Sequence, residues 1–293
     1  MKIGIGLPAT IPGTEGKNIL DWAKKADSGP FSTLGILDRL VFPNYEALIT
    51  LAAVAGVMQR VRLMTTVLLA PLRNTALLAK QAASLDALSG GRLTLGLGIG
   101  GREDDYLAAS VSFKTRGKRF EEQLATMQHI WSGQPLSDHI GPIGPTPVRA
   151  GGPEILIGGY SPAAIQRVGH WGDGFIAGGR DPKGTQQFFN LAEESWNAAG
   201  RQGKPRLVGC FYYALGPDAR ERAGTYLRRY YAFLGPMVET MINYLPITIE
   251  AIKERIQAYA DIGADEVILW PCTPDLEQLD QLAELVDQTL SRT

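Results

Sequence analysis

Glycines recur where the chain leaves predicted strands. Backbone without side chains at these positions could contact a small molecule directly. Gly96, Gly98 and Gly100 alternate within Gly90–Arg102, so one face of that strand and its exit carries no side chain. Either a flat molecule or a neighbouring strand could approach the backbone there. The run lacks the G-x-G-x-x-G order that opens a helix in dinucleotide-binding turns. We therefore favour a flat ligand, with close packing between strands as the alternative.

A second turn, Gly158–Pro162, leads from a predicted strand into a predicted helix. Pro162 suits the first turn of a helix, and free backbone N–H groups at a helix N-terminus attract anions. Ser161 could donate a hydrogen bond to a phosphate oxygen or could cap the helix. The sequence leaves both roles open.

A third turn, Gly172-Asp173-Gly174, feeds a short apolar strand that ends at Gly178 and Gly179. This exit again permits close approach to the backbone. We expect Asp173 to form the turn and not to act in catalysis.

A charged pair, Asp38-Arg39, follows the second predicted strand. Charges at the ends of barrel strands are costly unless they are paired or used. An ion pair between these neighbours or with Glu103 is one interpretation, and contact with a cofactor or substrate is the other. The residue types favour neither.

These residues need a scaffold that brings strand exits together, and β-rich runs do alternate with segments of helical periodicity. The predicted strands are Lys2–Leu7, Thr33–Leu37, Arg62–Leu68, Leu93–Gly98, Glu154–Gly158, Gly174–Ala177, Arg206–Ala214 and Glu266–Trp270. The predicted helices are Lys17–Ala26, Glu46–Gln59, Ala76–Leu88, Arg119–Trp131, Pro162–His170, Gly184–Ala199, Ala219–Leu234 and Ile249–Ile262, with Leu276–Leu290 outside the barrel. This order predicts an α/β fold, a single (β/α)8 TIM barrel over residues 1–293, with an open doubly wound sheet as the alternative.

Two stretches interrupt the alternation. Gly133–Pro153, after the fourth predicted helix, is rich in glycine and proline, so we expect a long insertion loop or a mobile lid near the pocket. Gly235–Thr248 contains Pro236 and Pro246, which interrupt helical geometry.

Composition limits the partners. A formal net charge of −1 gives no general attraction for nucleic acid or an anionic membrane, so a small-molecule substrate is expected. The apolar run in Met1–Pro8 is too short for a signal peptide, and no apolar stretch is long enough to span a bilayer, so we expect a cytoplasmic protein. Cys210 and Cys272 lie in apolar runs and should be small buried hydrophobes. The three histidines lack metal-ligand spacing, and we expect no metal.

Taken together, these residues resemble the luciferase-like monooxygenase superfamily, whose members are (β/α)8 flavoproteins that use FMN or the deazaflavin coenzyme F420. The likeness covers nearly the whole chain. It rests on Ile3–Pro8, Leu37-Asp38, Arg73-Asn74, Gly90–Gly101, Asp105-Tyr106, Arg116, Arg119–Glu122, Gly159–Pro162 and Gly172–Phe175.

The resemblance implies where a cofactor would lie. A backbone bulge with a cis non-prolyl bond, against which the flavin ring packs, corresponds here to about Thr66-Val67. The remaining cofactor residues implied are Gly98 and Gly100 beside the ring, Gly159, Tyr160 and Ser161 at the phosphate, and Gly178 and Gly179 along the tail. Asp38, Arg39 and Tyr106 are the candidates for contacts near the reacting atoms.

The sequence departs from the deazaflavin-dependent dehydrogenases of this family at two positions. Those enzymes place a histidine after the aspartate of the second strand and a glutamate after the fourth-strand glycines. Arg39 and Gly101 stand there in this chain. The acid and base for alcohol oxidation are therefore missing, whereas a deazaflavin-dependent reductase stays possible.

The resemblance implies an FMN-type monooxygenase in which reduced flavin activates dioxygen and the protein holds the ring away from bulk water. An F420-dependent reductase or dehydrogenase is the alternative, and Arg180 or Lys183 would then bind the anionic tail. A non-catalytic flavin-binding protein is the alternative of another class. We also expect a homo-oligomer and a flavin reductase that supplies reduced cofactor.

Overall fold

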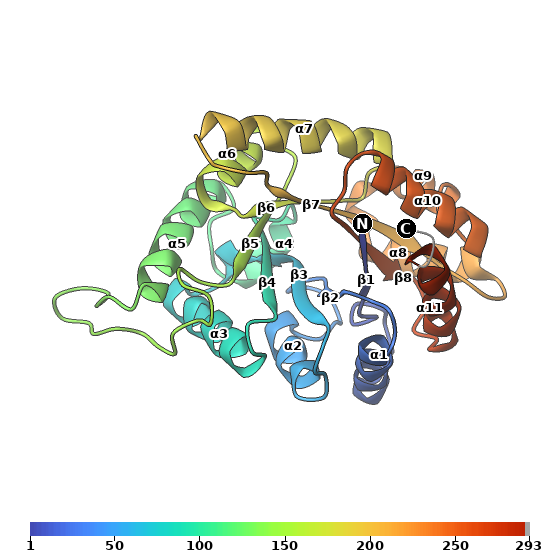
Figure 1. Ribbon diagram of the computed structural model, residues 1–293, viewed down its shortest axis with the longest axis horizontal. Coiled ribbons are helices and arrows are strands. Elements are labelled where there is room, and N and C mark those ends of the chain that lie inside the picture. The colour runs from blue at the N-terminus through green and yellow to red at the C-terminus, as the bar shows by residue number, and fades with distance from the viewer. Residues whose placement is uncertain (291–293) are drawn as a thin grey trace.

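The computed structural model describes residues 1–290, in which eight parallel strands close into a barrel in the order of the sequence (Figure 1). The strands are β1 (Lys2–Gly6), β2 (Thr33–Ile36), β3 (Arg62–Leu69), β4 (Leu93–Gly98), β5 (Glu154–Gly158), β6 (Gly174–Gly178), β7 (Arg206–Tyr213) and β8 (Glu266–Pro271). Because β1 pairs with both β2 and β8, the sheet has no edge, and the predicted TIM barrel is confirmed over the open sheet.

Helices surround the barrel on the outside (Figure 1). They are α1 (Gly16–Ser28), α2 (Ala47–Ala55), α3 (Thr75–Leu88), α4 (Glu103–Ala108), α5 (Arg116–Trp131), α6 (Pro162–Trp171), α7 (Pro182–Ala198), α8 (Ala219–Tyr230), α9 (Met237–Asn243), α10 (Ile249–Asp261) and α11 (Glu277–Leu290), with two 3-10 turns, η1 (Ala70–Leu72) and η2 (Ala232–Leu234). As predicted, the last helix lies outside the barrel, where α11 packs on α1 and α10. None of the helices within residues 1–290 is both long enough and apolar enough to cross a membrane.

The barrel interior is filled by large side chains from some strands opposite glycines from others. Ile268 and Trp270 project from β8, and a Cβ atom at Gly6 would lie only 2.2 Å from the Trp270 ring. Every residue of β4 and β8 is buried, as expected for a parallel sheet covered on both faces. The interior is therefore a packed core, with space left at the strand exits.

Two short helices were not predicted. The stretch expected to be irregular after Gly235 contains α9, and α4 begins a few residues after the end of β4. Both helices have fewer than eight residues, too few to show helical periodicity in a sequence. Pro236 immediately precedes α9, where a proline is tolerated because the first N–H groups of a helix have no partner within it. The predicted helix Ala219–Leu234 is also shorter than expected, since α8 ends at Tyr230.

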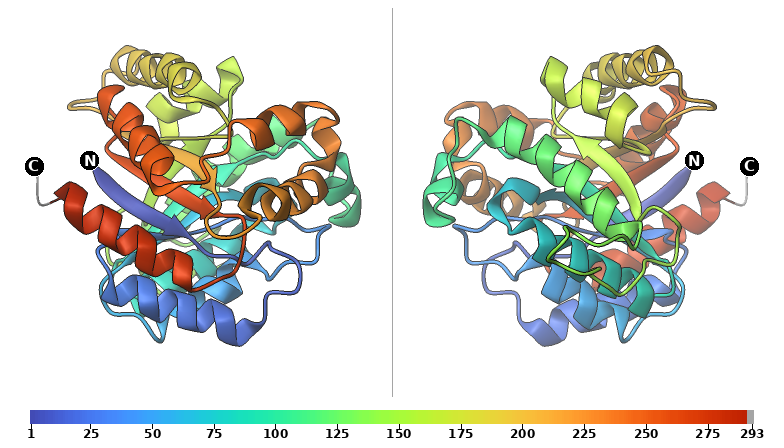
Figure 2. Two further views of the ribbon diagram at one scale, coloured as in Figure 1. Left: turned by 90° about the vertical axis from the view of Figure 1, so that its right-hand side faces the viewer. Right: turned by 90° about the vertical axis from the view of Figure 1, so that its left-hand side faces the viewer.

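Residues 133–153 contain no helix or named strand, as predicted, but they lie at the N-terminal ends of the strands. Val148 donates its backbone N–H to the Asp86 carboxylate (2.8 Å), close to the start of β4. Arg149 pairs with Asp173 (2.7 Å), just before β6. Helix-to-strand connections fall at this end of a barrel, whereas α8 and α9, in orange in Figure 2, lie at the opposite end from the N-terminus. The prediction of a lid near the pocket is therefore wrong.

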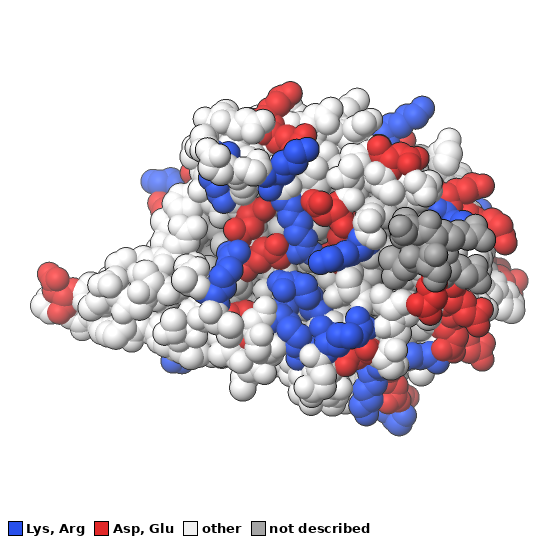
Figure 3. Space-filling model, viewed as in Figure 1, with Lys and Arg blue, Asp and Glu red and all other residues white. Residues whose placement is uncertain are grey.

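Ion pairs close the N-terminal end of the barrel. Arg206 at the start of β7 pairs with Glu154 of β5 and with the fully buried Glu266 of β8. Arg62 of β3 lies 3.5 Å from the same Glu154 carboxylate. Figure 3 shows charges of both signs mingled at the centre of the face viewed in Figure 1. The charges here are paired with one another, so this end of the barrel is structural.

The glycines of β4 make room for an irregularity in β3. Pairing of β3 with β4 shifts between Thr65 and Leu68. A Cβ atom at Gly96 would lie 2.0 Å from the Thr65 carbonyl oxygen, and one at Gly98 would lie 2.7 Å from a methyl group of Val67. The bare face of β4 is thus occupied by β3, which is the alternative that the sequence left open.

We predict that Gly96→Ala lowers the free energy of unfolding by about 1–3 kcal/mol, because the added methyl group collides with backbone that cannot move away. Urea unfolding measures the change. Gly101→Ala is the control, since nothing lies within 4 Å of a Cβ atom there. Equal stability of the two variants would contradict the packing of β3 against β4.

Candidate active site at the barrel mouth

A cavity of about 420 Å³ opens at the C-terminal ends of the strands. Its walls come from the exits of β2, β3, β5, β6, β7 and β8, and from the segment that follows α8. The apolar members are Leu37, Val67, Ile176, Phe211, Phe233, Leu234, Met241 and Trp270. Among the residues that the structure describes, no Asp, Glu, His, Lys or Arg lines this cavity. We call it the mouth cavity.

The irregular part of β3 faces the mouth cavity. The peptide bond between Thr66 and Val67 is cis, which confirms the position expected from the family resemblance. Both residues line the cavity, and the Thr66 hydroxyl donates to the Ile36 carbonyl of β2 (2.9 Å). β3 therefore presents backbone and small side chains to the space above the barrel.

The exits of β5 and β6 are tied together by Tyr160. Its hydroxyl donates to the Gly178 carbonyl and accepts the Gly178 backbone N–H (2.8 Å). Gly159 has a φ of +131°, which a residue with a side chain rarely adopts. Gly159, Tyr160, Gly178 and Gly179 all line the mouth cavity, so the structure brings these predicted cofactor residues together.

Three other predicted cofactor residues lie outside the cavity wall. The Ser161 hydroxyl accepts the Ala164 N–H (3.2 Å) and caps α6, which is one of the two roles left open by the sequence. The Cβ positions of Gly98 and Gly100 point to side chains of β3 and not to the cavity. Of this group, Ser161 alone lies on the turn next to the cavity.

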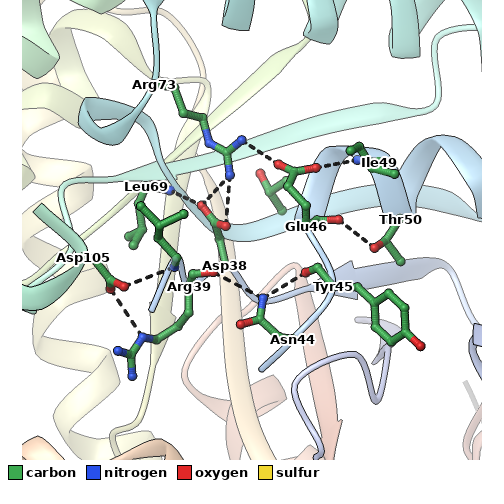
Figure 4. A network of polar contacts seen from close by, with 12 residues as sticks. Asp38, Arg39, Asn44, Tyr45, Glu46, Ile49, Thr50, Leu69, Arg73 and Asp105 are labelled. Carbon is green, nitrogen blue, oxygen red and sulfur yellow. Dashed lines mark hydrogen bonds and ion pairs between the residues drawn. The ribbon is translucent and has the colours of Figure 1, made fainter. Parts of the chain in front are cut away.

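Asp38 lies just beyond the end of β2 and forms a buried ion pair (Figure 4). Both of its carboxylate oxygens lie 3.0 Å from Nη2 of Arg73, and one also accepts the Leu69 N–H (2.9 Å) at the end of β3. Arg73 binds Glu46 as well. Burial raises the pKa of Asp38, although Arg73 and the Leu69 N–H oppose that shift. Asp38 therefore fixes the end of β3 through Arg73 and Leu69.

Arg39 belongs to a separate network on the other side of Asp38 (Figure 4). Its guanidinium lies 3.0 Å from Asp104 and 3.3 Å from the fully buried Asp105, both on α4. Asp105 also accepts the backbone N–H groups that follow Arg39. Arg39 thus forms ion pairs, as one of the two interpretations expected. Its partners are Asp104 and Asp105, and not Glu103 or the neighbouring Asp38.

Tyr106 is buried and does not line the mouth cavity. Its hydroxyl donates to the Ile99 carbonyl just after β4, and its ring packs edge-on against Phe113. Burial raises the pKa of Tyr106 to about 12, so the hydroxyl stays protonated at neutral pH. Asp38, Arg39 and Tyr106 all shape the rim of the mouth without reaching into it.

Several cavity residues were missed by sequence reasoning, above all Cys210, Tyr212 and Tyr231. Cys210 and Tyr212 lie two residues apart in β7, so both side chains are on the same face of the strand and line the cavity. This two-residue period could have identified them from the sequence. Both cysteines are buried and free, as predicted, and burial raises the pKa of the Cys210 thiol to about 12. Tyr231 lies in the irregular turn after α8, and no sequence pattern predicted its place.

A second hollow of about 450 Å³ adjoins the mouth cavity beside α9 and α10. The two share Gly179 and a stretch of β7. Arg180 and Arg255 line the second hollow, with Asp181 as its carboxylate. Cationic side chains are thus found next to the mouth cavity and not within it.

The residues present fit a flat aromatic cofactor. A glycine-lined wall formed by the exits of β5 and β6 faces apolar side chains of β7 and β8, and the size of the cavity is within the range of small-molecule sites. The turn from β5 into α6 presents a helix N-terminus with proline in its first turn, which suits a phosphate group.

Comparison with known proteins agrees with this geometry. The family described as luciferase-like monooxygenase matches residues 1–288. This chain belongs to the luciferase-like monooxygenase family. It is accordingly an oxidoreductase, and the alternative of a non-catalytic flavin-binding protein is set aside. An uncharacterized protein of Mycobacterium tuberculosis is 37% identical over 206 residues, which cover 61% of this chain and 71% of that protein.

Two solved structures share the fold at low identity. An F420-dependent secondary alcohol dehydrogenase in complex with an F420–acetone adduct has a TM-score of 0.79 at 17% identity, over 97% of each chain. The oxygenating constituent of 3,6-diketocamphane monooxygenase from Pseudomonas putida, in complex with FMN, has a TM-score of 0.73 at 16% identity, over 98% of this chain and 97% of that one. Proteins with this barrel fold therefore include one described with F420 and one described with FMN.

We predict that Arg73→Met lowers the free energy of unfolding by about 3–5 kcal/mol at pH 7, because it leaves Asp38 buried without its cation. The pKa of Asp38 in the folded variant then lies further above its unfolded value, so the folded state binds more protons and stability falls as pH rises through that interval. The deficit should accordingly shrink as pH falls toward about 4.

Chemical unfolding at several pH values tests this expectation. Lys25→Met is the control, since it breaks the exposed pair with Asp280 and should cost about 0–1 kcal/mol at each pH. A deficit of the same size at every pH would show that Asp38 does not cause it.

Proposed function

We propose that this protein is an FMN-dependent monooxygenase that acts on a small, uncharged organic molecule in the mouth cavity. The observation that carries the proposal is the cavity wall, which combines a glycine-lined side for a flat ring with an apolar side that holds no Asp, Glu, His, Lys or Arg among the described residues. Such a wall excludes water from the reacting atoms and supplies no general base. The chemistry must then come from the cofactor.

The residues would divide their roles as follows. Thr66 and Val67 would support one face of the ring, and the turn Gly159–Ser161 at the N-terminus of α6 would bind the phosphate. Gly178 and Gly179 would pass alongside the remaining part of the cofactor. Once reduced and bound, FMN would supply the activation of dioxygen.

Asp38, Arg39 and Tyr106 are proposed to act on the chemistry only by position. Asp38 holds the end of β3 through the Leu69 N–H, and Arg39 and Tyr106 hold α4 against the exits of β2 and β4. Their side chains are occupied by these contacts. Loss of any of these side chains would displace the wall of the mouth cavity. It would not remove a group that takes part in the reaction.

An F420-dependent reductase is the second candidate, and the hollow beside the mouth cavity favours it. Arg180 and Arg255 lie where an anionic cofactor tail could leave the mouth. The F420-dependent dehydrogenase of similar fold makes this candidate relevant. An alcohol dehydrogenase is less favoured, because no His, Asp or Glu lines the described mouth cavity.

A homo-oligomer and a flavin reductase partner stay predictions. An apolar groove between α2 and α3 supports the first, since Ile49, Leu77 and Leu88 are largely exposed there.

We predict that Gly178→Val weakens cofactor binding by about tenfold or more, because its side chain would project at the cavity wall where only Cys210 lies within 4 Å. Fluorescence titration with FMN and with F420 measures the affinity, and thermal unfolding shows whether the fold is intact. Gly178 suits this test better than Gly159, whose φ of +131° would add backbone strain to any substitution. Unchanged affinity for both cofactors would refute the placement, with Gly101→Val as the control for an exposed site.

We predict that Arg180→Gln weakens F420 binding by about two- to fivefold at low salt and leaves FMN binding unchanged, because only the longer anionic tail would reach the second hollow. Lys183→Gln is the matched control, since Lys183 does not line that hollow. If wild-type protein binds FMN and not F420, the second candidate is rejected outright.

A further inference from the structure

The hydroxyl groups of Tyr212 and Tyr231 form a hydrogen-bonded pair in the largely apolar wall of the mouth cavity. They lie 2.9 Å apart, Tyr212 on β7 and Tyr231 at the end of α8. Both residues line the mouth cavity. Within residues 1–290, the structure shows no hydrogen bond from either hydroxyl to a third group.

A pair of phenols has two hydroxyl protons, but their mutual hydrogen bond uses only one of them. The second proton can therefore be donated to a ligand in the cavity. Burial raises the pKa of both Tyr212 and Tyr231, so both phenols are neutral and protonated at physiological pH. The pair is a hydrogen-bond donor and not a base.

Surrounding contacts hold the pair in place. The Arg102 guanidinium lies 5.7 Å from the centre of the Tyr231 ring and 4.3 Å from that of Phe233, and it donates to the Tyr230 carbonyl (3.1 Å). The Tyr212 ring packs edge-on against Tyr231 at 5.9 Å. A donor fixed in this way loses little side-chain entropy when a ligand binds.

The other polar side chains of the described cavity wall have partners. Thr66 donates to the Ile36 carbonyl, the Tyr160 hydroxyl is held by Gly178, and the Cys210 thiol interacts with the Trp270 side chain. The glycine-lined side that we propose for the cofactor lies at the exits of β5 and β6, whereas the tyrosine pair comes from β7 and from the turn after α8. This separation favours the substrate over the cofactor as the acceptor.

We propose that the Tyr212–Tyr231 pair binds a neutral carbonyl oxygen of an otherwise apolar substrate, and so selects ketones or aldehydes over hydrocarbons of the same shape. This inference rests on the proposed function, in that the substrate is assigned to the mouth cavity beside the cofactor. A site built to donate a hydrogen bond discriminates strongly against ligands that cannot accept it.

The test compares acetophenone with ethylbenzene as probes, by calorimetric titration of the protein with and without FMN. Wild-type protein should bind acetophenone more tightly, and Tyr212→Phe/Tyr231→Phe should lose about three- to tenfold of that affinity while ethylbenzene binding is unchanged. Both substitutions are needed, because Tyr212 could donate its own proton once the Tyr231 hydroxyl is removed. Tyr230→Phe is the control, since its ring lies beside Tyr231 but outside the mouth cavity.

Isotope-edited infrared spectra of bound acetophenone supply a second readout, which reports directly on the hydrogen bond to the carbonyl oxygen. The carbonyl band should shift to lower frequency in wild-type protein and return toward its value in an apolar solvent in the double variant. A band at the apolar-solvent position in wild-type protein would overturn the inference. A loss of FMN affinity in place of acetophenone affinity would also overturn it, by assigning the pair to the cofactor. Failure of wild-type protein to bind FMN or F420 would contradict the proposed function alone.

Discussion

The fit of β3 into the bare face of β4 is the constraint on which the mouth of this barrel depends. The Thr65 carbonyl and the Val67 side chain occupy space that any side chain at Gly96 or Gly98 would fill. Register between the two strands shifts at this point, and the two residues within the shift, Thr66 and Val67, line the cavity. The β4 glycines thus serve the site indirectly, because they allow the neighbouring strand to form one of its walls.

Among the described residues, carboxylates and cationic side chains lie around the mouth cavity and do not line it. Asp38 and Arg39 each bind partners on elements next to the strand exits, and the ion pairs of Arg206 lie at the far end of the barrel. The cavity itself is lined by apolar and aromatic side chains, glycine backbone and a few neutral polar groups. Such a cavity, apolar inside and surrounded by ion pairs, is suited to hold and shield a reactive cofactor. This arrangement is consistent with an oxidoreductase of the luciferase-like monooxygenase family.

The sequence predicted the barrel well because strand and helix periods alternate along the whole chain. It also placed the bulge at Thr66-Val67, but only through the family resemblance, since no local pattern there predicts it. The prediction of a lid at 133–153 was wrong for a topological reason. A connection from a helix to the next strand lies at the N-terminal end of the barrel, away from the mouth cavity. Tyr231 could not have been found, because its place depends on how the chain turns after α8.

The most direct test of the central claim, that a flavin-type cofactor binds at the exits of β3, β5 and β6, is hydrogen–deuterium exchange with and without FMN or F420. The account predicts slower exchange in peptides that cover Thr66–Leu69, Gly158–Pro162 and Gly178–Arg180. Exchange in 133–153, at the other end of the barrel, should not change. Protection confined to 133–153, with none at the strand exits, would contradict the account.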